Sequence, residues 1–166
     1  DLELQHDGAI LSFGANDEVT LTHVHNSGLE LKHTATADDK PIILTLATGE
    51  TDMAANDVMG KIAFQAPDEG TGTDAVLVAA AIQARSEGDF SSSANATSLD
   101  FMTGASEAAA TKMTLSSVGN LTLTNSVADA NAGPVLNLYR NSASPADYDE
   151  MGEIQFNGEN SADQIV

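Results

Sequence analysis

The sequence predicts an all-β protein made of short antiparallel strands in serial β modules. Apolar and polar residues alternate along many short stretches, a pattern typical of strands that bury one face. Turn sequences such as Asp7-Gly8, Asn26-Ser27-Gly28 and Val118-Gly119-Asn120 separate these stretches. The pattern Met-Gly-x-Ile-x-Phe also occurs twice, at 59–64 and at 151–156, which indicates an internal repeat.

The first 33 residues are interpreted as an N-terminal β element of three or four short strands. The expected strands lie at 2–6, 9–14, 19–24 and 29–33. Asp7-Gly8 is a strong signal for a hairpin between the first two, because both turn positions favour positive φ. Residues 34–40 are polar and are interpreted as a linker. We therefore expect the element at 1–33 to be separate from the rest of the chain.

A second unit begins at Pro41, and its pattern starts again at Pro134. We interpret residues 41–133 as one complete β module and residues 134–166 as the truncated start of a second copy. A repeat that runs from Pro41 to Pro134 is too long for a short-coil solenoid, whose repeats run about 20 to 45 residues. The repeat also predicts equivalent backbone positions for Gly60 and Gly152. Since the sequence stops within an expected strand, we expect the natural protein to continue.

Inside the complete module, the alternation predicts five strand regions. They lie at 41–48, 58–66, 74–84, 97–103 and 111–124, the last divided into a hairpin by Val118-Gly119-Asn120. Residues 76–87 contain enough alanine for a helix, but Val and Ile are strand formers and strand is the favoured interpretation. Residues 105–113 are expected to include a short helical turn.

Charge excludes two classes of partner. Six Lys and Arg against 25 Asp and Glu give a net charge of −19, and the six basic residues are isolated from one another. Binding to nucleic acid or to an anionic membrane surface needs clustered basic side chains, so neither is expected. No apolar run approaches the roughly 20 residues that a membrane helix needs. A strongly acidic surface favours solubility and repulsion between particles, as suits an extracellular protein.

The expected core of a single chain is small. The sequence has no Trp, five Phe and two Tyr, and 26 of its apolar residues are Ala. Aromatic and large aliphatic side chains bury the most area, so burial must come from many small residues or from another chain. Cysteine is absent, which excludes a disulfide framework. We therefore predict an obligate homotrimer in which strands from three chains share one core.

Several stretches resemble tail fibres and other virion appendages of marine bacteriophages. They are "DGAILSFGANDEVTLTHVHNSGLELKH", "MGKIAFQAPDE", "SLDFMTGAS" and "KMTLSSVGNLTL", and the resemblance covers nearly the whole chain. It implies an elongated homotrimeric β fibre on a virus particle, extracellular and used as a spacer or for host contact. The implied partners are other copies of the chain, other virion proteins and a host surface receptor or glycan. It supplies no catalytic or cofactor-binding residue.

Two other classes of function stay open. The first is a bacterial extracellular adhesin or filament subunit built from serial β modules. The second is a polysaccharide depolymerase tail spike, which would need a pair of carboxylates flanking a sugar. Sugar clefts usually offer aromatic platforms, and only 4% of this chain is aromatic. No phosphate loop, nucleophile elbow or zinc-protease motif is present. We therefore expect no enzymatic activity and assign no catalytic residue and no cofactor.

His23 and His25 are the metal candidates, because they lie on the same face of an expected strand. On a three-fold axis, three such pairs would offer six nitrogens to iron or a similar metal. The alternative is a pair of exposed or hydrogen-bonded histidines, so no metal ligand is assigned. Asp38-Asp39 and the acidic stretch 147–150 lack the spacing of a calcium loop and are interpreted as solvated turns.

Overall fold

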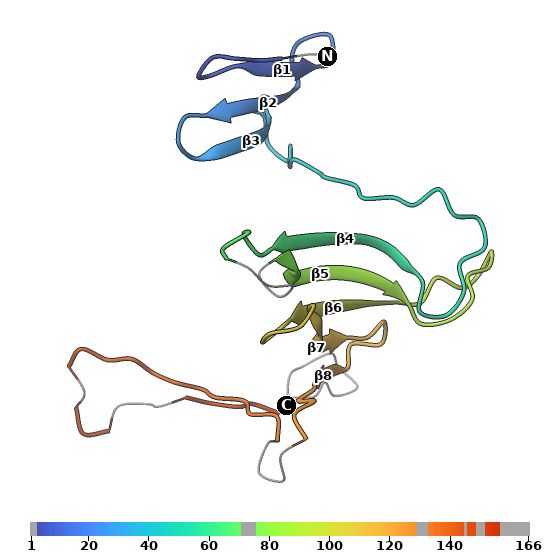
Figure 1. Cartoon of the computed structure of the whole chain (residues 1–166), viewed down its shortest axis with the longest axis vertical. Coiled ribbons are helices and arrows are strands. Elements are labelled where there is room, and N and C mark those ends of the chain that lie inside the picture. The colour runs from blue at the N-terminus through green and yellow to red at the C-terminus, as the bar shows by residue number, and fades with distance from the viewer. Residues whose placement is uncertain (1–2, 71–75, 129–132, 145, 149–151, 157–166) are drawn as a thin grey trace, which may run out of the picture. The chain divides into compact units, whose positions relative to one another are not determined.

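The computed structural model defines residues 3–70, 76–128, 133–144, 146–148 and 152–156. Within these residues the chain forms two antiparallel β-sheets and no α-helix, which confirms the all-β prediction (Figure 1). The chain divides into two compact units, Asp1–Thr51 and Asp52–Val166, and each unit contains one of the sheets. The described residues include no helix long and apolar enough to cross a membrane.

The first unit holds a three-stranded meander in the order β1-β2-β3. The strands are β1 (Ile10–Phe13), β2 (Val19–Val24) and β3 (Gly28–His33). Leu11 lies opposite Leu21, and Leu21 lies opposite Leu31, so the alternation places a row of leucines on one face. The predicted turn before β3 is present: Ser27 N donates to Val24 O at 3.0 Å, and Asn26 adopts a φ of 54°.

The strand expected at 2–6 is absent among its described residues, 3–6. Gly8 has a φ of 76°, and Ala9 N donates to His6 O at 3.1 Å, so the Asp7-Gly8 turn does form. The arm before the turn does not pair with β1, whose neighbour in the sheet is β2. A turn sequence fixes local φ angles but does not by itself determine whether both arms join a sheet.

The second unit holds a five-stranded meander in the order β4-β5-β6-β7-β8. Its strands are β4 (Val58–Gln65), β5 (Val78–Ser86), β6 (Thr97–Thr103), β7 (Ala110–Leu115) and β8 (Leu121–Leu123). The predicted strands at 58–66 and 97–103 are confirmed, as is the division of 111–124 into a hairpin. β5 begins and ends later than the predicted 74–84. Gly119, with a φ of 84°, closes the β7–β8 turn.

The alanine-rich stretch that contains β5 is a strand, as favoured over the helical alternative. It pairs with β4 on one side and with β6 on the other, so two sets of backbone hydrogen bonds outweigh the helix propensity of its alanines. The helical turn expected within 105–113 is wrong. Residues 105–108 form bends and Ala110 begins β7, because pairing with β6 takes up this part of the chain.

The strand expected at 41–48 is wrong for this chain. Residues 41–50 carry no strand, and Ile43 and Leu44 are 74% and 66% exposed. Alternation alone does not make a strand, because the backbone groups need a neighbouring strand to bond with. The sheet of the second unit ends at β4, which has β5 as its neighbour in the sheet.

The two copies of the repeated stretch differ in the described residues. Gly60 lies in β4 at a β-bulge, where the register shifts between Val58 and Gly60. Gly152 lies outside any strand, although a side chain there would meet Leu138 at 3.4 Å. The two glycines therefore do not occupy the equivalent strand positions that the repeat predicts. Met151, which matches Met59 in the repeated pattern, lies outside the described residues.

Few apolar side chains are buried in the described chain. The buried hydrophobic residues are Ala9 in the first unit and Met53 and Ala81 in the second. The described residues also include buried polar side chains, of which Ser86 and Asp100 are fully buried. The whole chain exposes 13227 Å². A compact monomer of 17.1 kDa exposes about 7,800 Å², so this chain exposes far more surface than a compact monomer of its mass.

Candidate functional site

The principal candidate is the apolar face of the β4–β8 sheet. Strand pairing aligns one residue from each strand into a row across the sheet. This central row consists of Ile62, Ile82, Phe101, Met113 and Leu123. The row on one side consists of Gly60, Ala84, Leu99, Leu115 and Leu121, and the row on the other side includes Phe64, Ala80 and Thr103. We call these three rows the apolar face.

No side chain in the three rows carries a charge. Large side chains on the face are nevertheless open to solvent: Ile62 is 47% exposed, Phe64 55% and Leu121 62%. Contiguous apolar surface of this kind marks interaction sites in soluble proteins, because covering it removes apolar area from water. The composition of the face therefore suits contact with another apolar surface.

The opposite face of the same sheet carries a buried ionic network. Arg85 Nε donates to Asp100 Oδ2 at 2.8 Å, and Arg85 Nη2 donates to Oδ1 at 3.3 Å. Gln83 Nε2 donates to Asp100 Oδ2 at 3.2 Å, and Thr114 Oγ1 donates to Oδ1 at 2.9 Å. Asp100 is fully buried and Arg85 is 25% exposed. Four donors thus satisfy a carboxylate that burial alone would destabilise.

The electrostatic consequences follow from these contacts. Burial opposes ionisation of Asp100, but the hydrogen bonds from Arg85, Thr114 and Gln83 outweigh it and lower the pKa of this carboxyl. The hydrogen bond to Asp100 raises the pKa of Arg85. Asp100 is therefore held ionised and fully paired. A carboxylate in this state stabilises the sheet, and it is a poor general acid or base.

Two further contacts fasten loops to the edge of this network. The buried Ser86 hydroxyl accepts a hydrogen bond from Asp57 N at 3.0 Å and donates to Ala54 O. Arg85 Nη1 donates to Asn56 Oδ1 at 3.0 Å, which secures the same loop. On the other side, hydrogen bonds from Ser117 and Ser98 lower the pKa of Glu87. These contacts hold the loops that flank the sheet.

No family model, curated protein or solved structure matches the chain. The roles of its residues therefore have to come from its own geometry.

The histidine pair predicted as a metal candidate lies in the first unit. His25 Nδ1 is 2.8 Å from Asp7 Oδ2, and His23 Nδ1 is 3.6 Å from Asp7 Oδ1. The two imidazoles thus turn toward the same exposed carboxylate. In the part of the chain that the structure describes, no group of three or more His, Asp or Glu is placed to hold a metal ion. The contact of His25 with Asp7 is of the hydrogen-bonded kind named as the alternative, and a metal site shared by three chains stays a hypothesis.

Two acidic stretches, Asp38-Asp39 and 147–150, were considered as calcium sites. Asp39 N donates to Asp38 Oδ1 at 3.0 Å, and Asp39 adopts a φ of 54°, so the chain bends locally at this pair. Of the acidic stretch 147–150, residues 149 and 150 lie outside the described residues. Where the structure defines the pair at 38–39, the interpretation as a turn agrees with the geometry.

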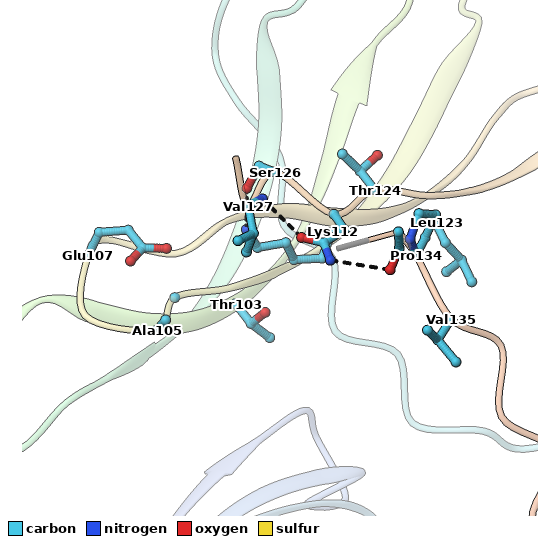
Figure 2. A pocket seen from close by; sticks show the side chains of 13 residues that line it. Thr103, Ala105, Glu107, Lys112, Leu123, Thr124, Ser126, Val127, Pro134 and Val135 are labelled. Atoms are coloured by element: carbon cyan, nitrogen blue, oxygen red, sulfur yellow. Dashed lines mark hydrogen bonds between the residues drawn. The ribbon is translucent and has the colours of Figure 1, made fainter. Parts of the chain in front are cut away.

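An open hollow of about 700 Å³ lies beside Thr103 and Leu123, at the margin of the apolar face (Figure 2). Lys112 crosses it, and its Nζ donates to Ser126 Oγ at 2.9 Å. Hydrogen bonds from the backbone of Ser106 and Ala105 lower the pKa of Glu107, which also lines the hollow. Among the residues that the structure describes, the lining contains no aromatic and no histidine side chain. It therefore lacks the stacking platform typical of a sugar cleft.

Sequence reasoning missed the apolar face and the Arg85–Asp100 pair. The signal for the pair was present: Asp100 interrupts an apolar strand, and Arg85 is one of only six basic residues. The register that brings them together depends on pairing between β5 and β6, which a single sequence does not specify. The same register assembles the apolar face from five separate strands.

Proposed function

We propose that this chain is a structural protein that assembles as a homotrimer in a virion appendage such as a bacteriophage tail fibre. Its role there is to act as a spacer or as part of the surface that contacts the host. The observation that carries the proposal is the uncharged apolar face of the β4–β8 sheet, which stays open in a single chain. The resemblance of the sequence to marine phage appendages supports the same role.

Surface area supports assembly. The chain exposes 13227 Å², against about 7,800 Å² for a compact monomer of its mass. A standard interface needs about 800 Å² from each partner, so the excess is enough for several interfaces. Extended stretches such as 41–48 add further exposed leucines and isoleucines. Association with other chains would bury this surface and supply partners for the edge strands.

The structure of the candidate sites supports a role without catalysis. Asp100, a carboxyl whose pKa is lowered by its hydrogen bonds, is fully buried and paired with four donors. The hollow beside the sheet has an Asp/Glu residue, Glu107, and a Lys, but no aromatic platform. We propose a non-enzymatic protein of the virion exterior. Soluble bacterial polysaccharides incubated with the chain should keep their length, and shortening would favour the depolymerase instead.

The first test is the mass of the purified full chain in solution. Light scattering should give three times the 17.1 kDa of one chain, with thermal unfolding that depends on concentration. A well-folded monomer with a concentration-independent transition would contradict the proposal. Reading the coding sequence on either side of this chain separates the two structural roles. A virion anchor supports the phage appendage, whereas a secretion signal with a cell-wall anchor supports the adhesin.

A further inference from the structure

We infer that the apolar face of the β4–β8 sheet is the surface through which copies of this chain bind one another, with this face of each copy turned toward the core that the copies share. This inference rests on the proposed homotrimer and adds which surface makes it. The occupant of the face is therefore another copy of this chain. Three observations carry the assignment: the composition of the face, its contrast with the opposite face, and the charge of the whole chain.

The composition fits a face that packs against another sheet. Its central row has a large apolar side chain on every strand, from Ile62 on β4 to Leu123 on β8. Small residues, Gly60 and Ala84, occupy the β4–β5 end of the next row, and Leu115 and Leu121 occupy its other end. Sheets that pack face to face need this mixture of large and small side chains in order to interdigitate.

The two faces of the sheet differ in how much surface they leave exposed in a single chain. In one chain the centre of the polar side is already closed: Gln83 and Asp100 are buried, and their polar atoms have hydrogen-bond partners. The apolar side stays open, with Leu99 and Leu115 at 38% and 42% exposed. Most of the exposed large apolar side chains of this sheet therefore lie on the apolar face, where covering them would remove apolar area from water.

The distribution of charge fits a second copy as the partner. The chain carries 25 acidic residues, and none of them lies in the three rows of the face. Two copies of a chain at −19 repel one another unless their contact surface is free of acids. A basic partner would instead select acidic residues at the contact. At the margin, Lys112 is turned aside by its hydrogen bond to Ser126.

Neighbouring residues on β4 and on β8 provide matched variants. Ile62 belongs to the apolar face, and Ala63 points to the opposite face; both are exposed. Leu121 and Thr122 form an equivalent pair on β8, at the other edge of the sheet. Changing each of the four to Glu alters the charge equally. Because all four side chains are exposed in the single chain, each variant should still fold.

The experiment measures the mass of the full-length chain and its four variants by sedimentation, with circular dichroism as a check on β structure. Ile62→Glu and Leu121→Glu should raise the concentration needed for half-assembly by at least about 100-fold, because each places unpaired charges in a desolvated contact. Ala63→Glu and Thr122→Glu should assemble like the wild type. Assembly of all four variants would overturn the face assignment and leave the homotrimer intact.

Other outcomes separate the two proposals. If all four variants dissociate, charge at the sheet edges rather than this face controls assembly, and the assignment is wrong. A wild-type dimer that only the two face variants dissociate would support the face and contradict the homotrimer. A wild type that stays monomeric at every concentration would overturn both. If the face instead binds an apolar partner such as a lipid surface, the wild type and all four variants should have the same mass. Only Ile62→Glu and Leu121→Glu should then lose binding to neutral lipid vesicles, and this result would also overturn self-association.

Discussion

Arg85 and Asp100 lie on adjacent antiparallel strands, with the guanidinium spanning both carboxylate oxygens at 2.8 and 3.3 Å. They are not directly opposite each other, because Asp100 pairs with Gln83 and Arg85 pairs with Ser98. The ion pair therefore runs diagonally across β5 and β6. Such a contact forms only when the two strands pair in the observed register. Substitutions in the pair therefore test how much it contributes to that register and to the stability of the sheet.

Removing the carboxylate should weaken the second unit. Asp100→Ala leaves Arg85 without its ionic partner beside a buried cavity, and we expect a loss of about 3 kcal/mol in the free energy of unfolding. Urea denaturation of the full chain measures this change. Asp68→Ala, which alters an exposed acid in a loop, should change stability by less than about 0.5 kcal/mol. Equal effects of the two substitutions would show that the network contributes nothing specific.

Acid should destabilise the same unit. The folded-state pKa of Asp100 is lowered, so near pH 4 the unfolded chain binds more protons than the folded chain. Stability is therefore fully present above the unfolded pKa, about 3.9, and is lost as pH falls through the folded pKa. Glu87, whose pKa is also lowered, acts in the same direction. The free energy of unfolding should be measured between about pH 5 and about pH 3, on both sides of that reference pKa. It should fall less steeply with falling pH in Asp100→Asn than in the wild type. Parallel curves would contradict this assignment.

Two glycines should respond differently to alanine. A side-chain carbon at Gly104 would collide with the backbone carbonyl oxygen of Glu107, whereas one at Gly88 would meet no atom within 4 Å. Because backbone cannot move aside as a flexible side chain can, Gly104→Ala should cost about 1 to 3 kcal/mol. Gly88→Ala should be neutral within about 0.5 kcal/mol. Thermal unfolding measures both, and a neutral Gly104→Ala would show that the β6–β7 loop adjusts freely.

Assembly should strengthen with salt. Three chains carry three times the −19 of one chain, and this repulsion is screened as the Debye length falls from about 30 Å at 0.01 M to about 8 Å at 0.15 M salt. We expect the concentration for half-assembly to fall at least about threefold over this range. Sedimentation at the two salt concentrations provides the measurement. Weaker assembly at higher salt would mean that ion pairs between chains dominate.

Local sequence patterns predicted much of the fold. The alternation around Phe101 located β6 with its observed bounds, and Gly119 marked the β7–β8 turn, because both signals act over a few residues. The stretch at 41–48 has the same alternation yet forms no strand. The difference lies in the partner: β6 has a neighbour on each side, and pairing is a property of the sheet rather than of the stretch.

The candidate site was harder to predict for the same reason. Phe101 and Ile82 become neighbours only through the register of β5 and β6, and this register depends on loops whose lengths the sequence gives without their conformations. β-bulges in β4 add to the difficulty, since each reverses the relation between sequence parity and sheet face. The histidine pair was found from spacing alone, but Asp7, to which both rings turn, could not be identified without the turn geometry.

The short connection between β4 and β5 bears on how a chain with a repeated stretch avoids pairing the wrong copy with β5. β4 ends at Gln65 and β5 begins at Val78, so about 12 residues close this pair, whereas the copy at 151–156 would have to reach β5 across about 65 residues. Loop-closure entropy then favours the nearer copy by about 1.5 kcal/mol, or about tenfold. During synthesis the nearer copy also emerges first. Sequence proximity thus selects the strand partner where the side chains of two copies are nearly alike.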